Sequence, residues 1–163
     1  MKREHVLSLL VENKPGVLSR VTGLISRRGF NIDSLAVAPT EDPTMSRMTV
    51  MVACDDVAYE QLIKQLHKLI SVYKINDLTD DSAIMRELIM VKVVAPAEKR
   101  GEVIQIANVF RAKVVDVGKN SLTIEATGDS DKLDGMEDLL RAYGIRETIR
   151  TGRIAMLRSG REN

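Results

Sequence analysis

The side chains that could carry catalysis are few and scattered. His5 and His67 are the only histidines, and neither has neighbours at the spacing of metal ligands. Cys54 is the only cysteine, so the chain has no partner for an intrachain disulfide or a multi-thiolate metal site. The sequence also lacks nucleophile-elbow, phosphate-loop and dinucleotide-binding glycine patterns. We therefore expect no catalytic residue and no metal site, and interpret these three side chains as surface or packing residues.

One short segment could bind a ligand instead of transforming it. Pro15 and Gly16 stand between an apolar strand pattern and an apolar helix pattern. Proline suits a helix start, where its missing N–H is not needed, and glycine lets a ligand approach the backbone. The free N–H groups and the dipole of a helix start favour a carboxylate. Asn13 offers an acceptor and donors together, which suits the zwitterion of an amino acid.

The next strand could complete such a site. Asn31 begins that strand and could bracket the same zwitterion, while Ile32 and Val37 would suit an aliphatic side chain. The turn is also compatible with simple helix capping, because proline and glycine are common at such turns. The residues alone leave both interpretations open.

The first half of the chain predicts the order βαββαβ. A helix is expected to follow Gly16 and to end at Gly29. A second helix follows Asp55 or Asp56, with apolar positions from Leu62 to Ile70. Strands are expected at 5–11, 30–39, 46–54 and 72–78. The first of these strands is apolar on both faces, so we expect both to be covered, by another sheet or subunit.

The second half repeats the pattern after a short polar linker. Strands are expected at 87–96, 113–117 and 120–128, with strand-like ends at 145–152 and 153–158. The fold class is therefore α+β, with two ferredoxin-like units whose antiparallel sheets carry helices on one face. The expected domains are 1–78 (βαββαβ), a linker at 79–84, 85–158 (βαββα, with an extra C-terminal strand) and a frayed tail at 159–163.

Composition excludes several classes of partner. The chain has 24 basic and 23 acidic side chains and a net charge of +1, which argues against nucleic acid and anionic membranes. Its few aromatic residues form no base-stacking pair on adjacent strands, as an RNA-recognition sheet of similar order would need. No uncharged apolar run approaches the ~20 residues of a membrane span, and no signal segment is evident. We therefore expect a cytoplasmic protein.

Longer motifs add a family resemblance. The stretch ENKPGVLSRVTGLISRRGFNIDSLAVAPTEDPTMSRMTVMV resembles the ACT domain of the acetolactate (acetohydroxyacid) synthase small regulatory subunit. QLHKLISVYKINDL in the first half, and RELIMVKV and IANVFRAKVVDV in the second, resemble the same family. The similarity covers essentially the whole chain. A bare PGVLSRV would be weak evidence, because many ACT domains carry it, whereas the combination is specific.

The resemblance implies a regulatory subunit of acetolactate synthase in valine, isoleucine and leucine biosynthesis. Such a subunit has no catalytic residues of its own and binds a catalytic large subunit that uses thiamine diphosphate (ThDP), Mg²⁺ and FAD. It raises the activity of the large subunit and confers feedback inhibition by valine, or another branched-chain amino acid, bound at the interface of an ACT homodimer. Carried onto this sequence, the effector site comprises Asn13, Lys14, Pro15, Gly16, Val17, Asn31, Ile32 and Val37.

Two other functions compete with this interpretation. A free-standing ACT-type amino-acid sensor would act on another target and would not bind a large subunit. A small enzyme on a ferredoxin-like fold would need a convergent acid, base, nucleophile or metal set, which the sequence does not offer.

Overall fold

The chain folds as two compact units. The computed structural model describes residues 2–80 and 83–159. Unit 1 comprises Met1–Ile84 with Arg153–Asn163, and unit 2 comprises Met85–Gly152. The predicted class, two ferredoxin-like units with antiparallel sheets, is confirmed.

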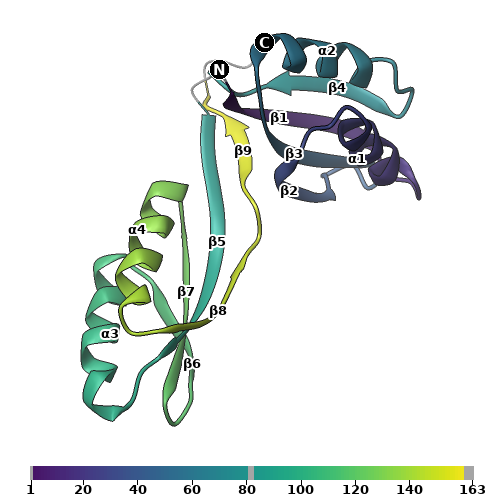
Figure 1. Ribbon diagram of the computed structural model, residues 1–163. Coiled ribbons are helices and arrows are strands. Elements are labelled where there is room, and N and C mark those ends of the chain that lie inside the picture. Colours follow the sequence, from purple (N-terminus) through teal and green to yellow (C-terminus); the bar gives the residue numbers. More distant parts are fainter. Residues whose placement is uncertain (1, 81–82, 160–163) are drawn as a thin grey trace. The chain divides into compact units, whose positions relative to one another are not determined.

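Unit 1 has the predicted order βαββαβ (Figure 1). By its contacts, a further strand near the end of the chain is grouped with unit 1. Its elements are β1 (Arg3–Glu12), α1 (Val17–Arg27), β2 (Ile32–Pro39), β3 (Met45–Cys54), α2 (Asp56–Leu66), β4 (Val72–Asp77) and, near the end of the chain, β9 (Ile154–Leu157). The antiparallel sheet has the order β2-β3-β1-β4, so β1 and β3 are its central strands. Both helices cover one face of the sheet, where Leu7, Leu9, Val50 and Leu62 contribute to the core.

The helix boundaries follow from local chemistry. Gly29 follows the C-cap residue of α1, Arg28, and adopts a φ of +77°, a conformation that glycine enters without strain. Asp55 caps α2, because its side chain accepts a hydrogen bond of 2.9 Å from the backbone N–H of Ala58. The expected continuation of this helix to Ile70 is wrong. The helix ends at Leu66, and Ile70 is 94% exposed in the turn before β4.

The face of the unit 1 sheet that lies away from the helices is also largely closed. Ser8 and Thr49 lie opposite each other on β1 and β3, and each is only 3% exposed. Part of this cover comes from the end of the chain. The backbone N–H of Arg153 donates to the Ser34 hydroxyl over 2.8 Å, and Ala155 is buried. The expected covering of both faces of the first strand is therefore met in part by the chain itself.

The end of the chain is grouped with unit 1. The sequence predicts residues 153–158 as the extra C-terminal strand of the second domain. Contacts group these residues with unit 1, while the backbone of β9 pairs with β5, the strand within which unit 1 ends and unit 2 begins. Of the expected linker, residues 81 and 82 lie outside the described residues, as do residues 160–163 of the expected frayed tail.

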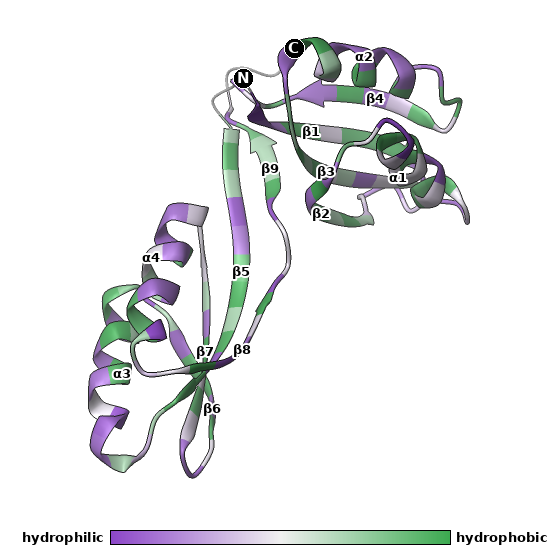
Figure 2. Cartoon of the chain, in the orientation of Figure 1, coloured by the Kyte–Doolittle hydropathy of each residue, from purple (hydrophilic) through white to green (hydrophobic). Residues whose placement is uncertain are grey.

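Unit 2 repeats the ferredoxin-like order. Its elements are β5 (Ala83–Val94), α3 (Ala97–Val109), β6 (Lys113–Val117), β7 (Ser121–Gly128), α4 (Ser130–Arg141) and β8 (Ile145–Arg150). The strands pair in the order β6-β7-β5-β8, and β6 and β7 form the predicted hairpin. Figure 2 shows hydrophobic residues along most of β1 and β5, the long strands that start the two units.

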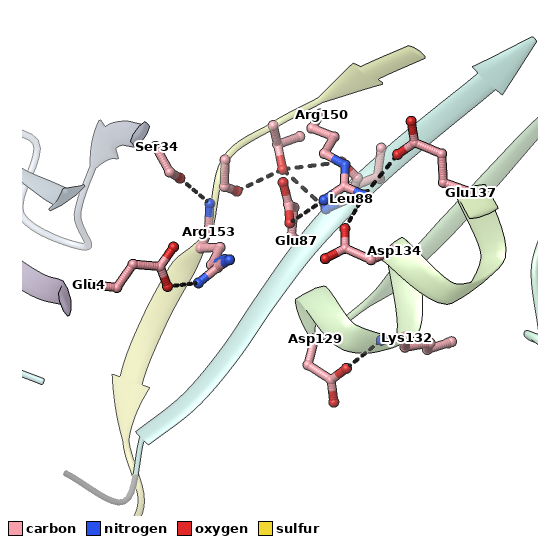
Figure 3. A network of polar contacts seen from close by, with 12 residues as sticks. Glu4, Ser34, Glu87, Leu88, Asp129, Lys132, Asp134, Glu137, Arg150 and Arg153 are labelled. Atoms are coloured by element: carbon pink, nitrogen blue, oxygen red, sulfur yellow. Dashed lines mark hydrogen bonds and ion pairs between the residues drawn. The ribbon is translucent and has the colours of Figure 1, made fainter. Parts of the chain in front are cut away.

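An ion-pair cluster joins three elements of unit 2. One guanidinium nitrogen of Arg150 lies 2.6 Å from Asp134 and 3.0 Å from Glu137 on α4, and the other lies 3.7 Å from Glu87 on β5 (Figure 3). The Glu87 side chain is only 7% exposed, so Arg150 provides the counter-charge of a nearly buried carboxylate.

Candidate functional site

The predicted effector turn is held at one end of the unit 1 sheet. The backbone N–H of Asn13 donates to the carbonyl of Thr44 over 2.7 Å, and its side-chain amide donates to the carbonyl of Pro43 over 2.9 Å. The turn after β1 is therefore fixed to the loop between β2 and β3. The Asn13 amide oxygen is not used in these bonds and remains available as an acceptor for a ligand.

Gly16 gives the turn its shape. It precedes α1 with a φ of +85°, and an added Cβ would meet no atom within 4 Å. Glycine is thus required by the backbone conformation and not by crowding from the protein. The open space over Gly16 is compatible with close approach of a ligand to the backbone.

The start of α1 carries unused hydrogen-bond donors. No side chain caps the helix among the described residues, and its first backbone bonds run from Val17 to Lys14 and from Arg20 to Gly16. The N–H groups of Leu18 and Ser19, which come between, have no protein acceptor within 2–80 and 83–159. A helix start in this state favours an anionic group such as a carboxylate.

In this conformation, Lys14 and Val17 make contacts within the protein. The Lys14 ammonium lies 3.3 Å from the Glu12 carboxylate, which also accepts a hydrogen bond of 3.1 Å from the Tyr73 hydroxyl. Lys14 and Tyr73 hold the pKa of Glu12 below its usual value, and the Glu12 carboxylate raises the pKa of Tyr73. The Val17 side chain is buried in the core against Val21.

The second group of predicted residues lies elsewhere. Asn31 is exposed beyond the far end of α1, and its side-chain amide donates to Asp33 over 2.7 Å. Because α1 has 11 residues, the helix alone separates Asn31 from the turn by about 16 Å. Ile32 is partly buried at the same end, whereas β2 returns Val37, 43% exposed, toward the turn. The expectation that Asn13 and Asn31 bracket one zwitterion does not hold within a single chain.

Sequence reasoning missed the residues that support the turn. Pro43, Thr44 and Tyr73 are distant from Asn13 in sequence, and only the pairing of β1 with β3 and β4 brings them near. No local pattern identifies them. The one available signal is Asp42 two residues before Thr44, a spacing typical of an Asx turn, and Asp42 does accept from Thr44 over 2.9 Å.

The candidate catalytic and metal-binding side chains of the sequence are not brought together near this turn. Within the described ranges, no group of three or more His, Cys, Asp or Glu side chains could hold a metal ion. His5 is buried and stacks on Tyr59, with ring centroids 3.8 Å apart, and Cys54 is buried with its pKa raised by burial. No helix in the described part of the chain is long and apolar enough to cross a membrane.

The fold and this turn define unit 1 as an ACT domain. Residues 7–74 match the family described as "AHAS small subunit-like ACT domain", and residues 86–159 match "Small subunit of acetolactate synthase". The chain is 52% identical to a probable acetolactate synthase small subunit of Archaeoglobus fulgidus, over 98% of this chain and 99% of the relative. It is 54% identical to the acetolactate synthase small subunit of Mycolicibacterium smegmatis, over 96% of this chain and 92% of the relative.

A solved structure agrees with the sequence relatives. The crystal structure of the acetolactate synthase small subunit from Thermotoga maritima matches with a TM-score of 0.86 and 40% identity, over 96% of this chain and 98% of that one. The chain belongs to the family of acetolactate synthase small subunits. These are regulatory subunits of a thiamine-diphosphate-dependent enzyme complex and are not themselves catalytic. The catalytic cofactors belong to the large subunit.

Proposed function

We propose that this chain binds the large subunit of acetolactate synthase in the cytoplasm, raises its activity and confers feedback inhibition by valine. The large subunit would carry ThDP, Mg²⁺ and FAD and would condense pyruvate. Membership of the small-subunit family supports a regulatory role, and the open glycine turn at the start of α1 supports an amino-acid effector. The free N–H groups of that turn suit the carboxylate, and the amide of Asn13 suits the ammonium group.

The effector site is proposed to form between two copies of the chain. The supporting observation is that Asn13 and Asn31 lie beyond opposite ends of α1 and therefore cannot contact one valine from the same chain. In a two-fold dimer, the turn of one copy can lie next to Asn31 of the other, and the symmetry creates two such sites. The strand β2 lies at the edge of the sheet and pairs only with β3 within the described residues, so its outer edge is available to a second copy.

Mixing the chain with the large subunit of the same organism tests the function directly. Acetolactate formation from pyruvate should rise when the chain is added and fall again when valine is added. Activation without a valine effect would support the regulatory function and contradict valine as the effector. An unchanged rate under both conditions would contradict the regulatory function as a whole.

A complementation experiment tests the shared site. Asn13→Ala and Asn31→Ala should each abolish high-affinity valine binding by calorimetry, because every site in either dimer lacks one amide. In a mixed dimer of the two variants, one site lacks both amides and the other is intact, so half a site per chain should return. If valine binding does not recover in the mixture, the two side chains do not contribute to one site from different chains, and the shared site is contradicted.

A further inference from the structure

A cavity of unit 1 lies on the sheet face away from the helices. It has a volume of about 350 Å³, which is in the range of sites for small organic molecules. The residues around it come from the sheet, from the loop after β2 and from β9. They are Ser8, Glu41, Arg47, Lys74, Asn76, Leu78, Ala155, Met156 and Leu157. This cavity is separate from the effector turn, because that turn leads into α1 on the opposite face.

The strand register brings the polar side chains of this cavity together. Leu10 on β1 lies opposite Arg47 on β3 and opposite Lys74 on β4, so the two cations flank one position of the central strand. Two residues earlier on β1, Ser8 lies opposite Asn76. Since side chains two residues apart share a face of a sheet, these groups all belong to one surface.

The charges of the cavity are not matched internally. Neither Arg47 nor Lys74 has a carboxylate within 4.0 Å in the part of the chain that the structure describes, and Arg47 donates to the Ser8 hydroxyl over 3.4 Å. Glu41 is the one acidic side chain among the lining residues, so the lining carries a net charge of +1. Ser8 itself is nearly buried, and a buried hydroxyl on a sheet face normally has a strong hydrogen-bond partner.

We propose that this cavity binds the carboxylate or phosphate group of a small organic anion. Arg47 and Lys74 pair with the anionic group, and the Ser8 hydroxyl and the Asn76 amide donate hydrogen bonds to it. Glu41 disfavours ligands with several negative charges and accepts an ammonium group where the ligand has one. The apolar side chains of Ala155 and Leu157 pack on the rest of the ligand from the side of β9.

Binding would fix β9 to the sheet of unit 1. In the described residues, Arg153, which directly precedes β9, donates to Ser34 and forms an ion pair of 3.1 Å with Glu4. An anion bound between Arg47 and the side chains of Ala155 and Leu157 adds contacts to both sides. The ligand therefore stabilises the association of β9 with the unit 1 sheet, independently of valine binding at the turn.

The test uses the full chain and two probes, pyruvate for a carboxylate and inorganic phosphate for a phosphate, at constant ionic strength. Each is titrated to about 10 mM while amide and methyl resonances are followed, a concentration that would saturate a site with a Kd of about 1 mM. We expect saturable shifts at Ser8, Asn76 and Ala155 from at least one probe. The responding probe identifies the anionic group. Valine should instead shift Asn13 and Gly16.

Matched double variants assign the effect to the cavity. Arg47→Gln with Lys74→Gln should weaken binding at least tenfold while the thermal unfolding midpoint stays within a few degrees. Arg27→Gln with Lys64→Gln removes the same charge from exposed helix positions and should leave binding unchanged. Equal weakening in both double variants would mean a general charge effect and would overturn the proposal. So would the absence of saturable shifts at the cavity with both probes.

Discussion

Single residues decide the character of the effector turn. Gly16 and Gly29 flank α1, both have positive φ values, and an added Cβ would meet no atom within 4 Å at either position. The two positions thus have nearly the same conformational requirement, but only Gly16 faces the proposed ligand. This pairing separates the effect of backbone strain from the effect on binding.

Replacing either glycine by alanine should cost a similar amount of stability, about 1–2 kcal/mol, because an L-residue is strained in the left-handed region. Valine affinity should fall substantially only in Gly16→Ala. Chemical denaturation and calorimetry on the two variants provide the comparison. Equal valine affinities in the two variants would show that no ligand approaches the backbone at Gly16.

Glu12 offers a pH-dependent signature of the same turn. Its pKa is lowered first by Lys14 and then by Tyr73, so its folded pKa lies below its unfolded pKa. The stabilising contribution is therefore present above the unfolded pKa and is lost as the pH falls through the folded pKa. In an NMR titration of the Glu12 carboxyl carbon, Lys14→Gln and Tyr73→Phe should both raise the pKa. A value unchanged in both would mean that these contacts do not persist in solution.

At the scale of elements, the ion-pair cluster around Arg150 ties β8 to α4 and β5 in unit 2. Arg150→Met should lower the free energy of unfolding of unit 2 by about 1–3 kcal/mol, because Glu87 is left nearly buried without its counter-charge. Arg146→Met on the same strand is the control, since Arg146 is exposed and has no ion pair within the described residues. Hydrogen exchange of β5 and β7 amides reports the change. Similar effects of both substitutions would mean that the loss of stability comes from changing strand β8 and not from the ion-pair cluster.

Features that neighbouring residues determine could be predicted from the sequence, whereas features that depend on distant parts of the chain could not. The turn at Pro15 and Gly16 was visible in the sequence, because proline, glycine and the change of apolar period act on neighbouring residues. The separation of Asn31 from Asn13 could not be predicted from the sequence, because it depends on the direction in which α1 runs. The end of α2 was misplaced for a related reason, since Leu69 packs on the core from a turn and continues the helical spacing.

At the scale of the whole molecule, unit 1 is assembled from two separated stretches of chain. The pattern of residues 154–157 predicted a strand correctly but could not tell which unit it joins, because a four-residue alternation is compatible with either sheet. For the same reason, the sequence indicated that both faces of the first strand are covered but did not identify β9 as part of the cover.

Ending the chain after Gly152 removes β9 and its pairing with β5, and should weaken unit 1. Residues of β9 line the cavity on the sheet face together with Leu78, and we expect unit 1 to lose about 1–3 kcal/mol from apolar surface returned to water. Amides of β1 and β3 should exchange faster, while those of β7 keep their protection. Met156→Ser in the full chain is the control, because Met156 is largely exposed. Unchanged protection of β1 would mean that β9 contributes no stability to unit 1.

The division of unit 1 along the chain has a consequence for synthesis on the ribosome. Unit 2 is continuous, whereas unit 1 lacks β9 until every residue of unit 2 has been translated. Domains usually fold in the order in which they emerge. Here the first unit to emerge would wait as a nascent chain with its second sheet face partly uncovered, and it would be completed after the unit that follows it.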